Sequence, residues 1–322
     1  MSSYCSYCYA KDVPLQTCAQ CHKRKYCSRE CQKKDWNSGQ NHKYFCCKAG
    51  EFNLDFEIKP SPGRGMGMFA LRDFSKNEYI IAERPLLENT GRQWNTSEYS
   101  MLKDSEKQAF QDLSGETMFE KYQRNKFGGN FKIFALISRV NHDCIGNTFY
   151  IPLRGSMVLV AKRDIKAGEE ILFAYIHMVY RLPEQRRIAL RREFGFDCNL
   201  QCSLCSNPDL DERAKELSLK QQQYLLHVKD CCDGKCNTDM NMMLRTVREI
   251  RELHNELNVN QSARVQFLNQ VSVYCMISKN VKVARELLEE SLDIAILCMN
   301  GDMDAPAVSQ VHSTISYEWC RP

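Results

Sequence analysis

Residues 5–46 read CSYCYAKDVPLQTCAQCHKRKYCSRECQKKDWNSGQNHKYFC, a stretch that carries four spaced pairs of soft metal ligands. The pairs are Cys5-x2-Cys8, Cys18-x2-Cys21, Cys27-x3-Cys31 and His42-x3-Cys46. Eight such ligands are enough for two closed tetrahedral zinc sites. The x2 pairs suit tight turns, whereas ligands four residues apart lie on the same face of a short helix. The spacing therefore predicts a two-zinc module, and it allows the pairs to combine either in sequence or interleaved.

The cysteine content raises a competing interpretation, because 18 cysteines in 322 residues could also form a disulfide framework. Residues 1–10 have no apolar segment after a basic start, so the sequence does not indicate secretion. A reducing compartment favours metal-bound or free thiols over disulfides. We therefore predict zinc, and we expect a protein of the cytoplasm, the nucleus or both.

The overall composition excludes several classes of protein. With 43% apolar and 26% charged residues, the chain is ordinary for a globular protein of two or three domains. Its longest apolar runs, such as residues 294–299, are far shorter than the roughly 20 residues that span a bilayer. The net charge of +4 is too small to predict nucleic-acid binding. The basic run at residues 22–25 is interpreted as a solvated finger surface.

The pattern after residue 50 predicts a compact β fold followed by helices. Short runs rich in β-branched and aromatic residues predict strands at residues 56–59, 78–82, 149–152, 156–161 and 170–175. A loop is expected over residues 60–67. A polar stretch from about 88 to 130 reads as a helical insertion, with Met101, Leu102, Phe110 and Leu113 as its buried side. From residue 209 onward the apolar period becomes 3.6, which predicts a helical tail.

Four separated segments of the middle region carry the candidate chemistry. They read GMGMFA at 65–70, SRVNHDC at 138–144, GEEILFAY at 168–175 and FGFDC at 194–198. In this order they resemble the motifs of the SET domain, and the cysteine and histidine pattern of residues 5–46 resembles the MYND zinc finger. Together they resemble the SET and MYND domain-containing protein-lysine methyltransferases over about residues 1–206. The helical tail is consistent with the TPR-like C-terminal region of that family.

The resemblance implies a fold class and a set of domains. The expected chain is an α+β multidomain protein with an all-β SET core. Its parts are a MYND zinc finger at 1–47, a SET domain at 50–182 with a helical insert at about 88–130, a post-SET zinc segment at 183–206, and a helical TPR-like region at 207–322. The finger precedes the whole SET domain, instead of interrupting it as in the best-known animal members.

The resemblance also implies three structural zinc ions. The family interleaves the finger sites, which would place Cys5, Cys8, Cys27 and Cys31 on one ion and Cys18, Cys21, His42 and Cys46 on the other. Cys144 would complete a third site with Cys198, Cys202 and Cys205. The family usually has C-x-C-x2-C in that last segment, so the two extra residues before Cys202 are a departure. Asp143 is another, because it stands where the family has a small hydroxyl residue.

The implied cofactor is S-adenosyl-L-methionine. By resemblance it is bound by Gly65, Met66, Gly67, Met68, Asn141, His142, Tyr175 and Phe196. Glycines let the backbone approach a ligand closely, although most such loops are merely turns. An isolated Asn-His pair is more often structural, and Phe196 could equally pack in the core.

The expected catalytic residues are Tyr175 and Phe194. Methyl transfer needs a neutral lysine amine, and an ordinary lysine with a pKa near 10.4 must first lose its proton and its water shell. A narrow aromatic channel ending in a tyrosine hydroxyl can achieve this by positioning and electrostatics. Many relatives carry tyrosine at the position of Phe194, so one channel hydroxyl is missing here.

The function predicted from these features is protein-lysine N-methylation of a histone or another protein. The partners expected are a protein or peptide lysine substrate and proline-containing peptides bound by the finger, with no membrane and at most weak nucleic-acid binding, and the protein is expected to be a monomer. The rival hypothesis is an inactive SET-MYND scaffold that binds short peptide motifs, and Phe194 is the residue that favours it.

Overall fold

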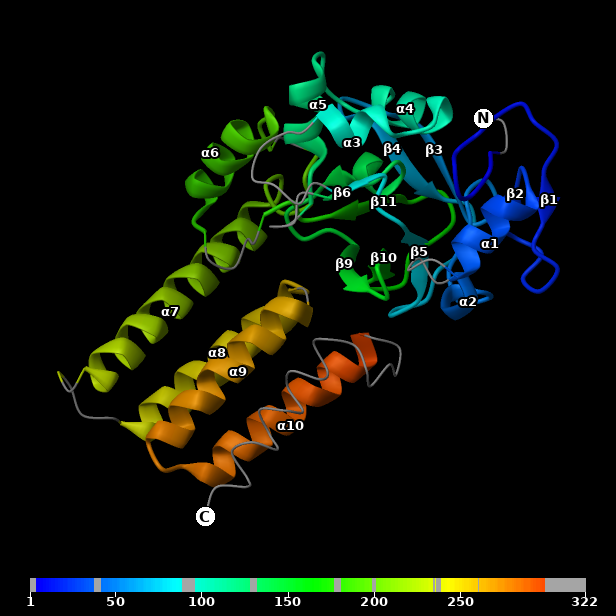
Figure 1. Ribbon diagram of the computed structural model, residues 1–322. Coiled ribbons are helices and arrows are strands. Elements are labelled where there is room, and N and C mark those ends of the chain that lie inside the picture. Colours follow the sequence, from blue (N-terminus) through cyan, green and yellow to red (C-terminus); the bar gives the residue numbers. More distant parts are fainter. Residues whose placement is uncertain are drawn as a thin grey trace. The chain divides into compact units, whose positions relative to one another are not determined.

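The computed structural model describes most of the chain (Figure 1). The described residues are 4–37, 42–88, 96–127, 132–176, 181–198, 201–233, 235, 239–259 and 261–298. The chain divides into two compact units. The first contains Met1–His142, Gly146–Phe173 and Glu193–Gly195, and the second contains Asp143–Ile145, Ala174–Arg192 and Phe196–Pro322.

The N-terminal finger is built around its cysteines. It contains the antiparallel strands β1 (Gln16–Thr17) and β2 (Lys25–Tyr26) and the helices α1 (Arg29–Asn37) and α2 (His42–Phe45), drawn in blue in Figure 1. Its buried cluster consists of Tyr26 and five cysteines, with Trp36 packed against it. Few aliphatic side chains contribute to this cluster. The finger must therefore be stabilised mainly by whatever its cysteines bind.

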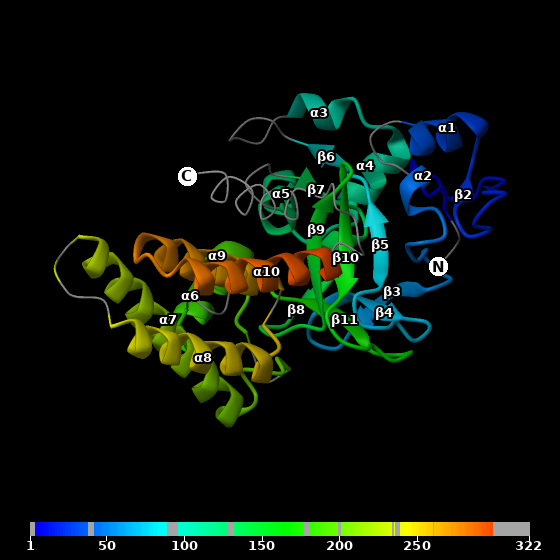
Figure 2. The ribbon, with the colours of Figure 1, turned by 90° about the horizontal axis from the view of Figure 1, so that it is seen from below.

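A seven-stranded sheet forms the core of the first unit. Its strands are β3 (Phe56–Ser61), β4 (Gly65–Ala70), β5 (Tyr79–Glu83), β8 (Asn141–His142), β9 (Thr148–Leu153), β10 (Ser156–Ala161) and β11 (Glu170–Phe173). The order is β3-β4-β11-β9-β10-β5, and β8 pairs with β11 in parallel. Figure 2 shows β9, β10 and β5 side by side. The chain thus has the predicted α+β class, with a β-rich core between a finger and a helical region.

The expected loop over residues 60–67 is wrong. This segment is a tight hairpin in which Ser61 pairs with Gly65 and Lys59 pairs with Gly67. Gly63 and Gly65 take positive φ values of 69° and 79°, a conformation that glycine adopts without steric cost. The turn is therefore confined to three residues, and β4 begins at Gly65. The predicted strand at 170–175 is likewise shorter and ends at Phe173.

In the described part of the insertion, three helices lie between two short paired strands. β6 (Leu87–Glu88) pairs with β7 (Lys132–Ile133), and between them lie α3 (Thr96–Ser100), α4 (Asp104–Gln111) and α5 (Met118–Asn125). Phe110 and Leu113 are buried as predicted, but Met101 is 76% exposed. The prediction for Met101 was wrong because it falls in the turn between α3 and α4, where a helical period does not apply.

The basic run at residues 22–25 is only partly a solvated surface, because His22 is exposed but Arg24 is not. The Arg24 side chain is only 12% exposed and donates to Asp35 at 2.7 Å and to the Ala82 carbonyl of β5 at 2.7 Å. Lys23 pairs with Asp55 at 3.1 Å. Arg24, predicted to face water, instead joins the finger to the sheet within the first unit.

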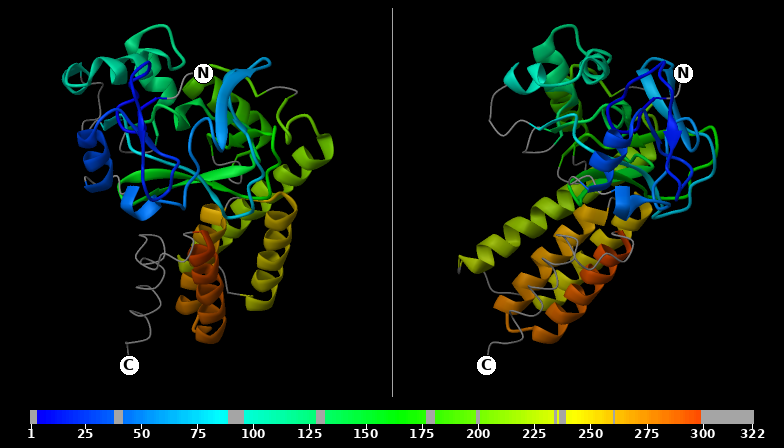
Figure 3. Two further views of the ribbon diagram at one scale, coloured as in Figure 1. Left: turned by 90° about the vertical axis from the view of Figure 1, so that its right-hand side faces the viewer. Right: turned by 45° about the vertical axis from the view of Figure 1, so that its right-hand side comes forward.

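The second unit is mainly helical. Its elements are α6 (Pro183–Phe194), which ends in the first unit, α7 (Pro208–Cys232), α8 (Met240–Glu256), α9 (Gln261–Ile277) and α10 (Val281–Cys298). α9 packs against α10, the orange pair in Figure 3, and α7 packs against α8. Asn207 caps α7 ahead of Pro208, a combination that favours a helix start. No helix in the described part of the chain is both long and apolar enough to cross a membrane.

Candidate metal sites and cofactor site

Three groups of cysteine and histidine side chains converge in the structure. Within each group all four ligand atoms lie within 4.8 Å of one another. The groups are Cys5, Cys8, Cys27 and Cys31; Cys18, Cys21, His42 and Cys46; and Cys144, Cys198, Cys202 and Cys205. The finger pairs thus combine in the interleaved order rather than in sequence.

The distances within these groups fit a tetrahedral metal. A tetrahedron with zinc–sulfur bonds of about 2.3 Å has sulfur–sulfur edges of about 3.8 Å. The Cys8 and Cys27 sulfurs are 3.6 Å apart, and the Cys144 sulfur lies 3.7 Å from Cys198 and 3.8 Å from Cys205. A disulfide would require about 2.0 Å. The donor set and its spacing are therefore consistent with zinc and not with disulfides.

The histidine of the second group is held in the form that binds metal. Nε2 of His42 lies 3.7 Å from the Cys21 sulfur. Burial and the nearby Arg24 guanidinium lower the pKa of His42 to about 4. Its imidazole is thus neutral at physiological pH and offers a lone pair.

The third group is anchored by Asp143, a residue whose role the sequence did not reveal. Its fully buried carboxylate accepts hydrogen bonds from the Ser203 amide and hydroxyl, both at 2.7 Å, and from the Ile145 amide at 2.9 Å. The Cys144 amide also donates to the Cys202 sulfur at 3.4 Å. Asp143 therefore fastens the loop that carries Cys144 to the segment that carries the other three cysteines.

Asn141 lies at the centre of the candidate cofactor residues in the first unit. β8 runs parallel to β11, which brings Asn141 opposite Leu172. Its side-chain amide donates to the Met66 carbonyl at 3.2 Å and to Glu170 Oε1 at 2.8 Å. Because both amide hydrogens are directed at these acceptors, the side-chain oxygen is the group through which Asn141 could accept from a ligand.

A glycine at position 67 is required by this arrangement. A Cβ on Gly67 would collide with the Glu170 carboxylate and lie 2.9 Å from the Asn141 amide nitrogen. A Cβ on Gly65 would meet nothing within 4 Å, so that position needs glycine only for its positive φ. Gly67 thus allows the Asn141–Glu170 pair to sit directly against β4.

Glu170 is a candidate site residue that sequence reasoning missed. It also accepts from the Ser61 hydroxyl at 3.0 Å and lies 3.6 Å from the Arg64 guanidinium. Glu170 therefore links the β3–β4 hairpin to Asn141. Its signal in the sequence is its place in the GEEILFAY segment, whose resemblance to a SET motif does not by itself assign a role to this carboxylate.

The predicted aromatic residues fall in both units. Tyr175 and Phe196 belong to the second unit, where their rings meet edge to face at a centroid distance of 6.0 Å. Phe194 ends α6 and belongs to the first unit, as do Gly65, Met66, Gly67, Met68, Asn141 and His142. Gly195 follows Phe194 with a φ of 77°, as is usual for the residue that terminates a helix.

Comparison with known families identifies the two N-terminal modules. Residues 5–46 match the MYND finger family, and residues 65–176 match the SET domain family. This chain is a SET and MYND domain protein. The finger match spans all eight ligands of the first two groups. The SET match includes Gly65 and Gly67 of β4, Asn141, Glu170 and Tyr175.

Several known proteins are similar to this SET and MYND domain protein. It is 31% identical over 216 residues to "Histone-lysine N-methyltransferase set5" of Schizosaccharomyces pombe, and the alignment covers 63% of this chain and 66% of that protein. It is 25% identical over 237 residues to "N-lysine methyltransferase SMYD2" of Homo sapiens, with 67% of this chain and 53% of that protein covered. It is 27% identical to "Histone-lysine N-methyltransferase SMYD3" of Homo sapiens, with 64% of this chain and 52% of that protein covered. The chain thus spans about half to two-thirds of the length of these relatives.

Proposed function

We propose that this SET and MYND domain protein is an S-adenosyl-L-methionine-dependent protein-lysine N-methyltransferase that acts on lysines of histones or other proteins. The observation that carries the proposal is the Asn141 amide, held between the Met66 carbonyl and Glu170 beside Gly67. This arrangement lies within the SET match, and the similar proteins bear the names of lysine methyltransferases.

The residues present fit the proposed cofactor. Gly65 is exposed and has nothing within 4 Å of its Cβ position, so a ligand can approach the β4 backbone there, and the Asn141 side-chain oxygen can accept from an amino group. Gly65, Met66, Gly67, Met68, Asn141, His142, Tyr175 and Phe196 would hold the cofactor. Once bound, S-adenosyl-L-methionine supplies a methyl group activated by its sulfonium.

The protein's own part in the reaction is to prepare the lysine. The amine must be neutral and stripped of water before it can attack. In this proposal the Tyr175 hydroxyl orients the amine and stabilises the charge that develops on it, while Phe194 lines the lysine channel. Phe196 supports Tyr175 through the edge-to-face contact of their rings.

The proposed metals are three structural zinc ions, one in each cysteine group. They would contribute folding free energy directly, on the order of 10 kcal/mol per site. The third ion would hold the segment that ends in Cys205 to the Cys144 loop. Elemental analysis of the purified protein should give three zinc ions per chain. A value near two would show that the third cysteine group binds no zinc.

Calorimetric titration with S-adenosyl-L-methionine and a tyrosine substitution test the activity together. Tyr175→Phe should lower turnover by about 100-fold or more while leaving cofactor affinity largely intact, because the hydroxyl acts mainly in the transition state. Asn141→Ala should abolish cofactor binding instead. A Tyr175→Phe variant as active as the parent protein would refute the catalytic assignment.

The second candidate function is an inactive scaffold that binds short peptide motifs of partner proteins, including proline-containing ones through the finger. Phe194 supports it, because this residue offers no hydroxyl to a lysine channel. A protein that binds no S-adenosyl-L-methionine in the titration would favour the scaffold over the enzyme. In either function we propose a monomer of the cytoplasm or the nucleus.

A further inference from the structure

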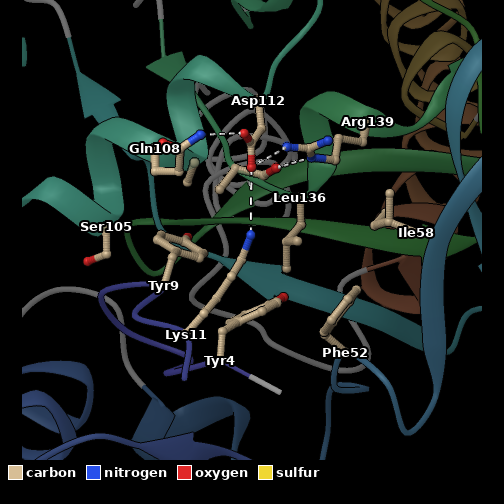
Figure 4. Close-up of a pocket in the computed structure, with 12 residues that line it drawn as sticks. Tyr4, Tyr9, Lys11, Phe52, Ile58, Ser105, Gln108, Asp112, Leu136 and Arg139 are labelled. Carbon is tan, nitrogen blue, oxygen red and sulfur yellow. Dashed lines mark hydrogen bonds and ion pairs between the residues drawn. The ribbon is translucent and has the colours of Figure 1, made fainter. Parts of the chain in front are cut away.

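A cavity of about 190 Å³ lies where the finger, the insertion and the sheet of the first unit meet (Figure 4). Tyr4 and Tyr9 reach it from the finger, Phe52 from the segment before β3, and Ala109 from α4. None of the proposed metal ligands or cofactor residues lines it. The cavity is therefore separate from the candidate site described above.

The lower part of this cavity, as drawn in Figure 4, is aromatic. The Tyr4 ring stacks on Phe52 with centroids 4.6 Å apart, and it lies 5.8 Å from the Tyr9 ring. A cavity of about 150 Å³ is already large enough to bind benzene. This one can thus accept a single aromatic or branched aliphatic group.

The Tyr4 hydroxyl is a donor without an acceptor. Tyr4 is only 8% exposed, and its hydroxyl has no hydrogen-bond partner among the described residues. The Tyr9 hydroxyl, by contrast, donates to Glu83 at 3.0 Å. Burial, with the nearby carboxylates of Glu51 and Glu83, raises the pKa of Tyr4, so its proton is retained. A buried donor of this kind is costly unless a ligand satisfies it, and the two carboxylates favour a neutral acceptor.

The other end of the cavity is positively charged. Lys11 and the mostly buried Arg139 share one carboxylate, Asp112, at 3.7 Å and 3.9 Å. Both separations exceed the 2.7–2.9 Å of a charge-assisted hydrogen bond. Arg139 Nε also donates to the Ala135 carbonyl at 3.1 Å, and burial lowers the pKa of its guanidinium despite the nearby Asp112. The charged residues that line the cavity are two cations, Lys11 and Arg139, and one carboxylate, Asp112, so this end suits an added carboxylate.

We propose that this cavity binds the C-terminal residue of a peptide that ends in an apolar amino acid. The terminal carboxylate pairs with Arg139 and Lys11, and the apolar side chain fills the space beside Phe52. The preceding amide carbonyl accepts the hydrogen bond that Tyr4 offers. A peptide C-terminus combines a carboxylate, an apolar side chain and a neutral carbonyl, the three groups that fit this cavity. A simple carboxylic acid lacks the neutral carbonyl.

Ligand-detected NMR titrations of the full chain with three small probes test this assignment. The probes are N-acetyl-phenylalanine, its C-terminal amide, and 3-phenylpropionate. We expect the N-acetyl acid to bind at least tenfold more tightly than the amide, which lacks the charge. We also expect it to bind more tightly than 3-phenylpropionate, which lacks the carbonyl. Equal binding of acid and amide overturns the carboxylate assignment, and equal binding of the two acids replaces the peptide with a free organic acid.

Three variants and one control locate the binding. Lys11→Ala removes a half-exposed cation. It should weaken binding of the N-acetyl acid severalfold and leave binding of the amide unchanged. Tyr4→Phe removes only the unpartnered hydroxyl, and it should weaken binding of both N-acetyl probes about three- to tenfold and leave binding of 3-phenylpropionate unchanged. Ala109→Leu should block all three probes by filling the cavity, with Lys107→Leu on the same helix as its matched control. Binding that survives Ala109→Leu, or no binding of any probe to the parent protein, refutes the proposal.

Discussion

Replacing Asp143 by asparagine should weaken the third cysteine site selectively. The buried carboxylate receives three hydrogen bonds, two of them from backbone amides. Asparagine offers one oxygen and one amide group, so at least one of these donors faces another donor. Loss of a buried, charge-assisted partner costs about 2–4 kcal/mol. If the cost falls on the metal-bound form, zinc affinity drops on the order of 30- to 700-fold.

An opposing electrostatic effect must be weighed against this loss. Four thiolates around one zinc ion carry a net charge of −2, so removing the Asp143 charge also relieves repulsion. The hydrogen bonds act at the carboxylate itself, at 2.7–2.9 Å, and we expect their loss to prevail. Ser203→Ala is the matched comparison, because it removes one of the three bonds and costs only about 1 kcal/mol.

Competition with a chromogenic zinc chelator measures the effect. In the parent protein we expect three zinc ions to be released as the chelator concentration rises. In Asp143→Asn one of the three should be released at a much lower chelator concentration, and the two finger ions should be unaffected. A release curve that coincides with that of Ser203→Ala would show that the carboxylate does not support the site.

Three further outcomes are expected. Glu170→Gln should weaken S-adenosyl-L-methionine binding about three- to tenfold in calorimetry, because Asn141 loses a charged anchor; unchanged affinity would exclude this positioning role. Burial, assisted by Arg264, lowers the pKa of His254 to about 4, so the unfolded chain binds more protons than the native one between pH 4 and 6.5. Stability should therefore fall by about 2 kcal/mol between pH 7 and pH 5, and His254→Gln should remove that part of the slope in urea unfolding. If the protein is a methyltransferase, Phe194→Tyr should shift products toward monomethyl-lysine or raise a weak activity; an unchanged rate and product distribution in mass spectrometry would place Phe194 outside the channel.

Ligand spacing and the family resemblance each predicted a different part of the metal sites. Residue type and spacing identified all the soft ligands of the finger, because a metal requires specific donors at short separations. Spacing could not choose between sequential and interleaved pairing, since that depends on how β1, β2, α1 and α2 fold together. The resemblance supplied the pairing, and also the contribution of Cys144, which lies more than 50 residues before its partners.

The residues that sequence reasoning missed share one property. Asp143 and Glu170 are carboxylates that bond distant parts of the chain, and the Tyr4 ring stacks on the distant Phe52 while its hydroxyl has no partner among the described residues. Glu170, for example, meets Ser61 and Asn141 only because β11 lies between β4 and β8. Local patterns report burial and secondary structure, but they do not report which distant groups a carboxylate or a hydroxyl will meet.

The burial of Arg24, which was predicted to be solvated, has a consequence for the finger as a whole. Arg24 lies between Cys21 of one metal group and Cys27 of the other, and it bonds both Asp35 in the finger and the Ala82 carbonyl in the sheet. Its guanidinium also lies 3.3 Å from the buried Glu51 carboxylate, so displacing it would leave buried negative charge unpaired, which typically costs 3–5 kcal/mol. The position of Arg24 depends on the two loops that the metals would fix. Zinc bound by the finger would therefore also stabilise the edge of the sheet at β5, and the finger is an integral part of the first unit rather than an appendage to it.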